Sequence, residues 1–133
     1  MNDIVKVVIV EDERNSVMTL EWLMKTLFPD KLKLVGVFGT VPDAVDGIQK
    51  LEPDLVLLDI ELDGDNCFSL LEQLQPVNFE IIFTTAYSKY MERALTYCSI
   101  AFLLKPIAVP DFRQAILLAE PRIKKTRMAK QVE

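Results

Sequence analysis

Five short apolar segments, separated by stretches with helical periodicity, place the strongest constraint on the fold of this chain. They are IVKVVIV (4–10), LKLVGVF (32–38), LVLL (55–58), EIIFTT (80–85) and AFLL (101–104). Nearly continuous apolar runs of this length are typical of strands that are buried on both faces, as in parallel sheets. Because a helical stretch follows each run, the sequence predicts a doubly wound α/β domain whose five-stranded parallel sheet carries helices on both faces.

The helical stretches are marked by apolar residues that recur three and four positions apart. Thr40 is expected to cap the second helix, because its side chain can accept a backbone hydrogen bond from the first turn. Trp22 is expected to pack against the core from the first helix. The marker residues of the five stretches are Leu20, Leu23, Met24 and Leu27; Ala44, Val45, Ile48 and Leu51; Phe68, Leu71 and Leu74; Tyr90, Ala94 and Tyr97; and Phe112, Ile116 and Leu117.

The C-terminal segment differs in composition from the rest of the chain. Pro121 is expected to kink or end the last helix, because proline lacks the backbone N–H that the helix requires. The residues after it, RIKKTRMAKQVE (122–133), are rich in Lys and Arg. We therefore expect one domain over residues 1–120 and a basic, solvated helical extension or linker over residues 121–133.

Composition excludes several classes of function. The net charge is −5, so the domain by itself is a poor ligand for nucleic acid, whose phosphates require basic patches. Histidine is absent, which excludes Ser-His and Cys-His catalysis, histidine metal ligands and phosphohistidine chemistry within this chain. Cys67 and Cys98 form no CxxC pair and are expected to be reduced, apolar fillers.

Targeting signals also bear on the expected location. The first residues, MNDIVKVVIVEDE, lack the pattern of a signal peptide, and no apolar run approaches the length of a membrane span. We therefore expect a cytoplasmic protein with no membrane contact.

Polar residues with reactive groups follow several of the predicted strands. The first strand leads into Glu11 and Asp12, the third into Asp59, and the fifth into Lys105. The fourth ends in Thr84 and Thr85. Ligands of doubly wound sheets bind outside the carboxyl ends of the strands, so these side chains are expected to meet there.

The chemistry of this group of side chains favours phosphoryl transfer. Clustered carboxylates do not ionise together at low cost without a cation, and oxygen ligands suit Mg²⁺, with Mn²⁺ as an alternative. Asp59 is the candidate nucleophile, because a carboxylate can form an acyl phosphate. Lys105 can neutralise the incoming phosphoryl group, and the hydroxyl of Thr85 can donate to one of its oxygens. Taken alone, Asp12 would be interpreted as a helix cap and Lys105 as a surface lysine. The prediction of a site depends on the convergence of the strand-end side chains at one edge of the sheet.

Four motifs, VVIVEDE, LVLLDIE, FTTAY and FLLKP, resemble those of the response-regulator receiver domain in the same order, over about residues 4–120. The resemblance implies a flavodoxin-like fold. It implies Asp59 as phosphoacceptor, Glu11 and Asp12 as acidic metal ligands, and Lys105 as the phosphate-binding lysine. The backbone carbonyl of Glu61 is implied as a further metal ligand, and the Lys105–Pro106 peptide bond is implied to be cis.

The same resemblance implies how the domain would switch. Thr85 matches the switch hydroxyl and Phe102 the switch aromatic of the family. Two further residues are implied to flank the path of the water that hydrolyses the acyl phosphate. They are Glu61, two residues after the phosphoacceptor, and Tyr87, two residues after the switch hydroxyl. A tyrosine ring can exclude water, whereas a carboxylate can orient it, and we expect exclusion to dominate.

Partners follow from the resemblance as well. A sensor histidine kinase is the implied phosphoryl donor. Phosphorylation is expected to favour a homodimer through the last two helices and the fifth strand, with Lys89, Arg93 and Arg113 as contacts. The segments DIELDGDN and FTTAYSKYMERAL resemble receivers joined to LytTR-type DNA-binding domains, so a LytTR-type transcriptional output, absent from this sequence, is expected. The domain is expected to catalyse only its own phosphorylation and dephosphorylation.

One departure from the family pattern and two alternative functions stay open. The loop after Asp59 lacks the Met-Pro and glycine of many receivers and adds Asp63 and Asp65, which either are solvated or tighten the cation. One alternative is a receiver-like interaction module that works without phosphorylation. The other is a small phosphohydrolase with an aspartyl-phosphate intermediate, in which Glu61 would be the second catalytic acid.

Overall fold

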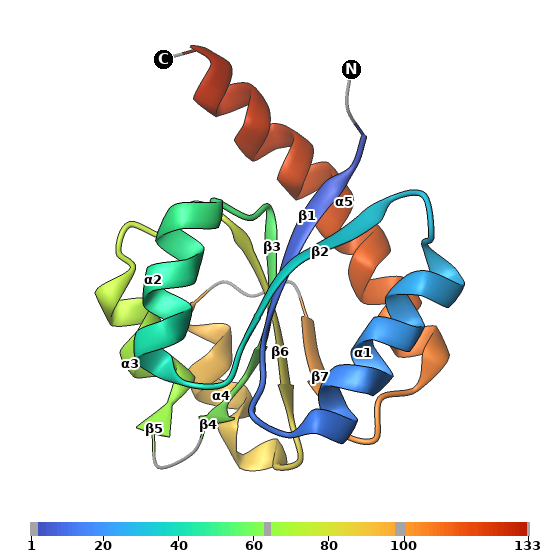
Figure 1. The fold of residues 1–133 in the computed structure, drawn as a ribbon, viewed down its shortest axis with the longest axis vertical. Helices are drawn as coiled ribbons and strands as arrows, with labels where there is room; N and C mark the ends of the chain where they lie inside the picture. The colour runs from blue at the N-terminus through green and yellow to red at the C-terminus, as the bar shows by residue number, and fades with distance from the viewer. Residues whose placement is uncertain (1–2, 63–64, 98–100, 133) are drawn as a thin grey trace.

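The computed structural model describes residues 3–62, 65–97 and 101–132 and contains a five-stranded parallel sheet (Figure 1). The strand order is β2-β1-β3-β6-β7. The order reverses between β1 and β3, which makes the carboxyl ends of these two strands the expected ligand site. The predicted fold class is confirmed. The bounds are β1 (Val5–Val10), β2 (Leu32–Phe38), β3 (Leu55–Asp59), β6 (Glu80–Thr85) and β7 (Ala101–Leu104).

Helices cover both faces of the sheet, and each face has its own core. On one face, α1 (Arg14–Leu27) and α5 (Val109–Val132) pack on the odd-numbered residues of β1 and β3. On the other face, α2 (Val41–Leu51), α3 (Cys67–Gln73) and α4 (Met91–Leu95) pack on the even-numbered residues. A short 3₁₀ helix, η1 (Ser88–Tyr90), precedes α4. The strands are therefore buried on both sides, which explains their continuous apolar sequences.

Two local predictions about capping and the cysteines can be compared with the structure. The hydroxyl of Thr40 accepts a hydrogen bond from the backbone N–H of Asp43 at 3.3 Å, so the predicted N-cap of α2 is confirmed. Cys67 is a free, fully buried thiol in the α2–α4 core, and burial raises its pKa above the usual range. It acts as the apolar filler that we expect, whereas Cys98 lies outside the described residues.

The prediction that Trp22 packs in the core is wrong. Its side chain is 57% exposed. In α1 the buried residues are Leu20, Leu23 and Met24, which face the sheet. Residues of a helix share a face when they are three or four positions apart, so Trp22, which is one or two positions from each of these, faces the opposite side.

Of the two expectations for Pro121, a kink or the end of the last helix, the second is wrong, because α5 runs to Val132 and carries Pro121 inside it. Contacts beyond the proline hold this extension to the domain. Ile123 is 3% exposed and belongs to the core beneath α1 and α5. Pro121 itself is exposed, so water can satisfy the carbonyl that its missing N–H leaves free. The basic tail is thus a helical extension, and Figure 1 shows it projecting past the end of the sheet at which β1 begins.

No helix in the part of the chain that the structure describes is both long enough and apolar enough to cross a membrane.

An ion pair fixes the helical extension to the start of β3. The guanidinium of Arg127 donates to both carboxylate oxygens of Asp54, at 3.1 and 2.6 Å, and also to the backbone carbonyl of Ile4. Asp54 accepts a further hydrogen bond from the backbone N–H of Lys6 at 2.8 Å. Burial raises the pKa of Asp54, but the hydrogen bonds from Arg127 and Lys6 outweigh it, so the net pKa lies below its usual value.

Replacing Arg127 with alanine is expected to lower the free energy of unfolding by about 1–2 kcal/mol, because charge-assisted bonds to a half-buried carboxylate are lost. Since the pKa of Asp54 is lowered in the folded state, the effect is present in full above pH 3.8 and fades as the pH falls through the lowered value. Denaturant unfolding at pH 7 and below pH 3 measures it, with Lys125→Ala, an exposed residue of the same helix, as control. Equal stability of Arg127→Ala and the parent at pH 7 would contradict the assignment.

Candidate functional site

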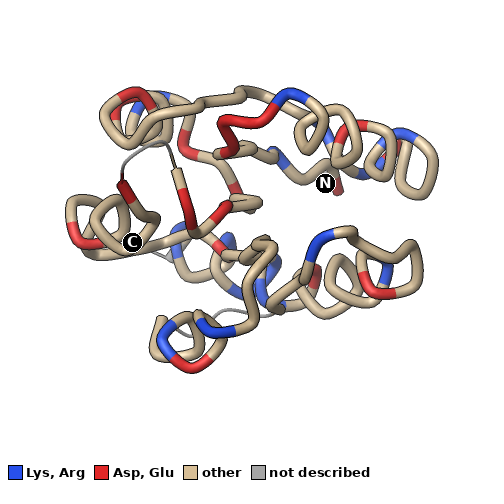
Figure 2. Tube along the Cα trace, turned by 90° about the horizontal axis from the view of Figure 1, so that it is seen from below, with Lys and Arg blue, Asp and Glu red and all other residues tan. Residues whose placement is uncertain are grey.

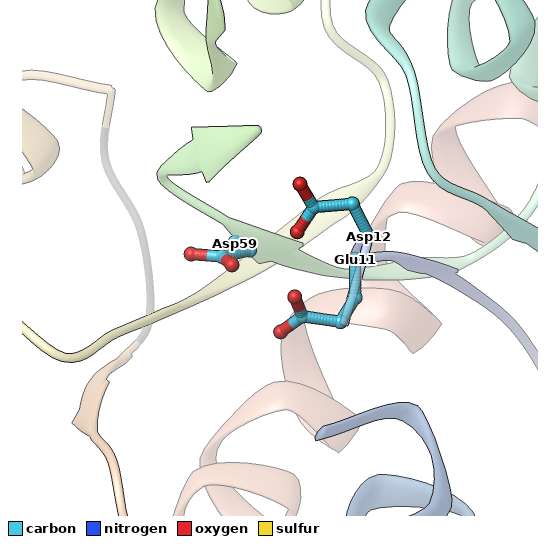
Figure 3. A group of neighbouring side chains, drawn as sticks. All are labelled: Glu11, Asp12 and Asp59. Carbon is cyan, nitrogen blue, oxygen red and sulfur yellow. The ribbon is translucent and has the colours of Figure 1, made fainter. Parts of the chain in front are cut away.

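The carboxyl ends of the central strands bring three carboxylates together. Glu11, Asp12 and Asp59 each offer an oxygen, and these oxygens lie within 4.8 Å of one another (Figure 3). In Figure 2, which looks onto this end of the sheet, acidic positions gather near the middle of the edge. Glu11 and Asp59 are 3% and 6% exposed, while Asp12 is exposed to solvent. The predicted convergence of these residues is therefore present in the fold.

Lys105, from the end of β7, supplies the positive charge of the site. Its Nζ donates to Oε1 of Glu11 at 2.6 Å and to Oδ2 of Asp59 at 3.2 Å. Burial alone lowers the pKa of Lys105, but the hydrogen bond and charge of Glu11 and Asp59 outweigh it and raise the pKa above its usual value. The ammonium is thus held charged between the two buried carboxylates. The Lys105–Pro106 peptide bond is cis, as the motif implies.

The carboxylate of Glu11 is the most perturbed acid of the site. Its pKa is raised from 4.5 to about 7, chiefly by burial and further by the neighbouring Asp59, and this net rise includes the opposing effect of the hydrogen bonds from Lys105 and the N–H of Glu13. One ammonium does not balance three carboxylates at this spacing. A divalent cation with oxygen ligands would favour the ionised form of all three, so this donor set fits Mg²⁺ or Mn²⁺.

The loop after Asp59 is held by backbone pairing that its sequence does not indicate. Two short strands, β4 (Glu61–Leu62) and β5 (Asp65–Asn66), form an antiparallel ribbon. The N–H of Glu61 donates to Oδ1 of Asp59 at 3.2 Å. Asp65 is exposed and accepts from the N–H of Asn66, in keeping with the solvated alternative, whereas Asp63 lies outside the described residues.

The predicted switch residues lie in β6 and β7, the two strands that follow β3 in the order of the sheet. Thr85 is 1% exposed, and its hydroxyl accepts a hydrogen bond from the N–H of Tyr87 at 3.2 Å. Phe102 is half-buried against the core beneath α3 and α4. Tyr87 is 50% exposed, and Nζ of Lys89 lies 5.4 Å from the centroid of its ring.

Two further hydroxyls belong to the site, and only that of Tyr90 was not identified from the sequence. Tyr90, expected only as a core marker of a helix, donates its hydroxyl to the carboxylate of Glu61, and this hydrogen bond raises the pKa of Tyr90. Thr84 pairs with Asp59 in the ladder, and its buried hydroxyl has no hydrogen-bond partner within the described ranges. Thr84 was expected at this edge because it ends the fourth predicted strand, whereas the spacing of Tyr90 pointed to packing.

The arrangement is suited to nucleophilic attack by Asp59. The carboxylate lies at the end of a buried strand, with one oxygen bonded to a backbone N–H and the other to an ammonium. These donors hold the carboxylate in one orientation while leaving further lone pairs of its oxygens free. The same ammonium can neutralise negative charge on an incoming phosphoryl group.

Comparison with known proteins agrees with this geometry. Residues 7–117 match the family described as the response regulator receiver domain. The chain is 32% identical over 103 residues to the sensory transduction protein LytT of Bacillus anthracis, covering 76% of this chain and 41% of LytT. It is 31% identical over 104 residues to the transcriptional regulatory protein BtsR of Salmonella typhi, covering 77% and 43%. The chain thus spans about two fifths of the length of these relatives.

A solved structure gives the same answer for the fold. The signal receiver domain of a modulated diguanylate cyclase from Desulfovibrio desulfuricans G20 superposes with a TM-score of 0.78 at 29% identity, over 92% of this chain and 98% of that one. Fold, motif order and sequence match therefore agree: the chain belongs to the response regulator receiver domain family of two-component signalling.

Proposed function

We propose that this receiver domain accepts a phosphoryl group on Asp59 from the phosphohistidine of a sensor histidine kinase. The observation that carries the proposal is the contact of Lys105 with both Asp59 and Glu11 at the carboxyl edge of the sheet. An oxygen of Asp59 attacks phosphorus, the phosphorus–nitrogen bond of the donor breaks, and the imidazole nitrogen keeps the electron pair and is protonated by solvent.

The side chains of the site divide this work between them. Glu11, Asp12, Asp59 and the backbone carbonyl of Glu61 would hold Mg²⁺, or Mn²⁺ in its place, which when bound neutralises charge on the phosphoryl oxygens. Lys105 exchanges its bond to Asp59 for one to the phosphoryl group. The N–H of Glu61 keeps the reacting carboxylate oriented. Beyond this single transfer and the slow hydrolysis of the acyl phosphate to Asp59 and inorganic phosphate, the domain has no turnover of its own.

The phosphoryl group then changes the surface of the domain. The hydroxyl of Thr85 leaves the N–H of Tyr87 and turns to a phosphoryl oxygen, and Phe102 moves into the space beside it. The change reaches the face formed by α4, β7 and α5, where apolar side chains are exposed, including Met91, Leu104 and Leu118. Burial of these side chains in a homodimer is favourable, with Lys89, Arg93 and Arg113 as polar contacts.

The output of the switch is proposed from the relatives. LytT and BtsR, which the chain matches over about two fifths of their lengths, are described as a sensory transduction protein and a transcriptional regulator. We propose control of a LytTR-type transcriptional output in the cytoplasm.

Phosphorylation by a small donor tests the proposed site directly. Incubation of the purified domain with acetyl phosphate and Mg²⁺ is expected to add one phosphoryl group, followed by intact-mass measurement. Asp59→Asn should take up none. Asp12→Ala or removal of Mg²⁺ by a chelator should slow the reaction at least about tenfold, because charge at the site is no longer balanced. Asp65→Asn, an exposed acid of the neighbouring loop, is the control and should react like the parent.

The alternatives predict other outcomes of the same experiment. A receiver-like interaction module would take up no phosphoryl group on Asp59. A phosphohydrolase would release phosphate in steady turnover from generic phosphoesters. Either result would contradict the proposal.

The lifetime of the acyl phosphate depends on Tyr87 in this proposal. Tyr87→Ala is expected to speed the loss of phosphate about tenfold if the ring contributes about 1.4 kcal/mol to the barrier by excluding water. Glu61→Ala is expected to have a smaller effect. Decay is followed at fixed Mg²⁺ after removal of the donor, and a Tyr87→Ala variant that decays no faster than the parent rules out the ring as the gate.

Dimerisation is tested by sedimentation with and without beryllofluoride, a mimic of the phosphoryl group. The mimic should shift the domain towards a dimer, and Leu118→Glu, which places a charge on the proposed face, should prevent the shift. The same oligomer with and without the mimic, over a wide range of concentrations, counts against the proposed face.

A further inference from the structure

The side chain of Glu61 starts from a fixed backbone position beside the phosphoacceptor. Glu61 pairs with Asn66 across the β4–β5 ribbon, and its backbone N–H donates a hydrogen bond to the carboxylate of Asp59. The residue is exposed, so packing does not select a rotamer for the side chain. The position of the carboxylate therefore depends on the hydrogen bonds that it makes.

Tyr90 makes that hydrogen bond. Its hydroxyl donates to Oε1 of Glu61 at 2.5 Å and so joins the loop after β3 to the η1 helix after β6, 29 residues away in sequence. The ring of Tyr90 is itself restrained, because it is half-buried and packs against the core beneath α3 and α4, and Nζ of Lys89 lies 5.1 Å from its centroid. A charge-assisted bond from a restrained ring fixes the carboxylate more firmly than solvent does.

We propose that Tyr90 is a positioning residue: it holds the carboxylate of Glu61 away from the water that attacks the phosphoryl group on Asp59. The lifetime of the phosphorylated state is thereby increased. This inference rests on the proposed function, since it concerns the lifetime of the same acyl phosphate. Tyr90 takes no part in the phosphoryl transfer proposed above, and its hydroxyl is linked to the site only through Glu61.

The chemistry of hydrolysis explains why a restrained Glu61 matters. The oxygen of water attacks phosphorus, the bond from phosphorus to the Asp59 oxygen breaks, and Asp59 keeps the electron pair as a carboxylate. Inorganic phosphate leaves, and the water proton passes to a base or to solvent. A carboxylate contributes to this step only if it reaches the water in good geometry. Tyr90 occupies one oxygen of Glu61 and fixes its direction, so release of Glu61 makes an acceptor available near Asp59.

The experiment compares decay of the phosphorylated state in four variants at fixed Mg²⁺. Tyr90→Phe removes only the hydroxyl and is expected to speed the loss of phosphate about three- to fivefold, which is well below the effect of a fully positioned general base, because the released carboxylate reaches the water in only part of its orientations. Tyr97→Phe is the matched control: it removes the hydroxyl of another half-buried tyrosine, whose ring stacks on Phe68, and should decay like the parent. In the Glu61→Ala background, Tyr90→Phe should cause no further change, because the residue that it releases is gone.

A second readout reports the tether without phosphorylation. The carbon-13 signal of the Glu61 carboxylate in the unphosphorylated domain should shift in Tyr90→Phe and stay in place in Tyr97→Phe. If the parent takes up phosphate but Tyr90→Phe decays at the parent rate, or accelerates decay equally without Glu61, the inference is overturned and the proposed function stands. An unmoved carboxylate signal overturns it as well. If the parent takes up no phosphate, both the function and the inference fail.

Discussion

The ammonium of Lys105, held between the buried carboxylates of Glu11 and Asp59, is the interaction on which the site depends. Without a positive charge, two carboxylates that are less than a tenth exposed would repel each other in a poorly solvated place. With one ammonium the site is still short of positive charge, as the raised pKa of Glu11 indicates. The structure therefore combines a nucleophile with an unmet need for cations, which is the condition under which a phosphoryl group and its metal bind well.

The parallel sheet makes this contact possible between distant parts of the chain. Glu11 and Lys105 are 94 residues apart, and Asp59 lies between them in sequence and in the sheet. All three project to the α1–α5 side, because they continue the odd-numbered residues of their strands. The apolar strands thus serve as rigid supports whose burial on both faces sets the positions of the charged groups at their ends. The hydrogen bonds of Glu61 and Tyr87 then connect this fixed centre to two loops that are more exposed.

The fold and most of the site could be predicted from the sequence, because the residues that form the strands and the site stand next to one another in recognisable local patterns. Continuous apolar runs marked all five strands, and polar residues at the ends of four of them marked the site. The β4–β5 ribbon could not be predicted, since strands of two residues have no periodicity. Pro121 was misjudged because tertiary contacts of Ile123 and Arg127 outweigh the local preference to end the helix. The hydroxyl of Tyr90 was missed because its partner, Glu61, comes from another loop.

The charge balance of the site can be measured directly by carbon-13 NMR titration of the carboxylates in the unphosphorylated domain. Crowding and burial predict that Glu11 titrates near pH 7 without Mg²⁺, as against its ordinary value of 4.5, and that saturating Mg²⁺ lowers its pKa well below 7. Replacing Lys105 with methionine should raise the pKa of Glu11 further in the absence of the metal. A Glu11 that titrates at its ordinary value and does not respond to Mg²⁺ would contradict the view that these residues form a charge-deficient site built for a cation and a phosphoryl group.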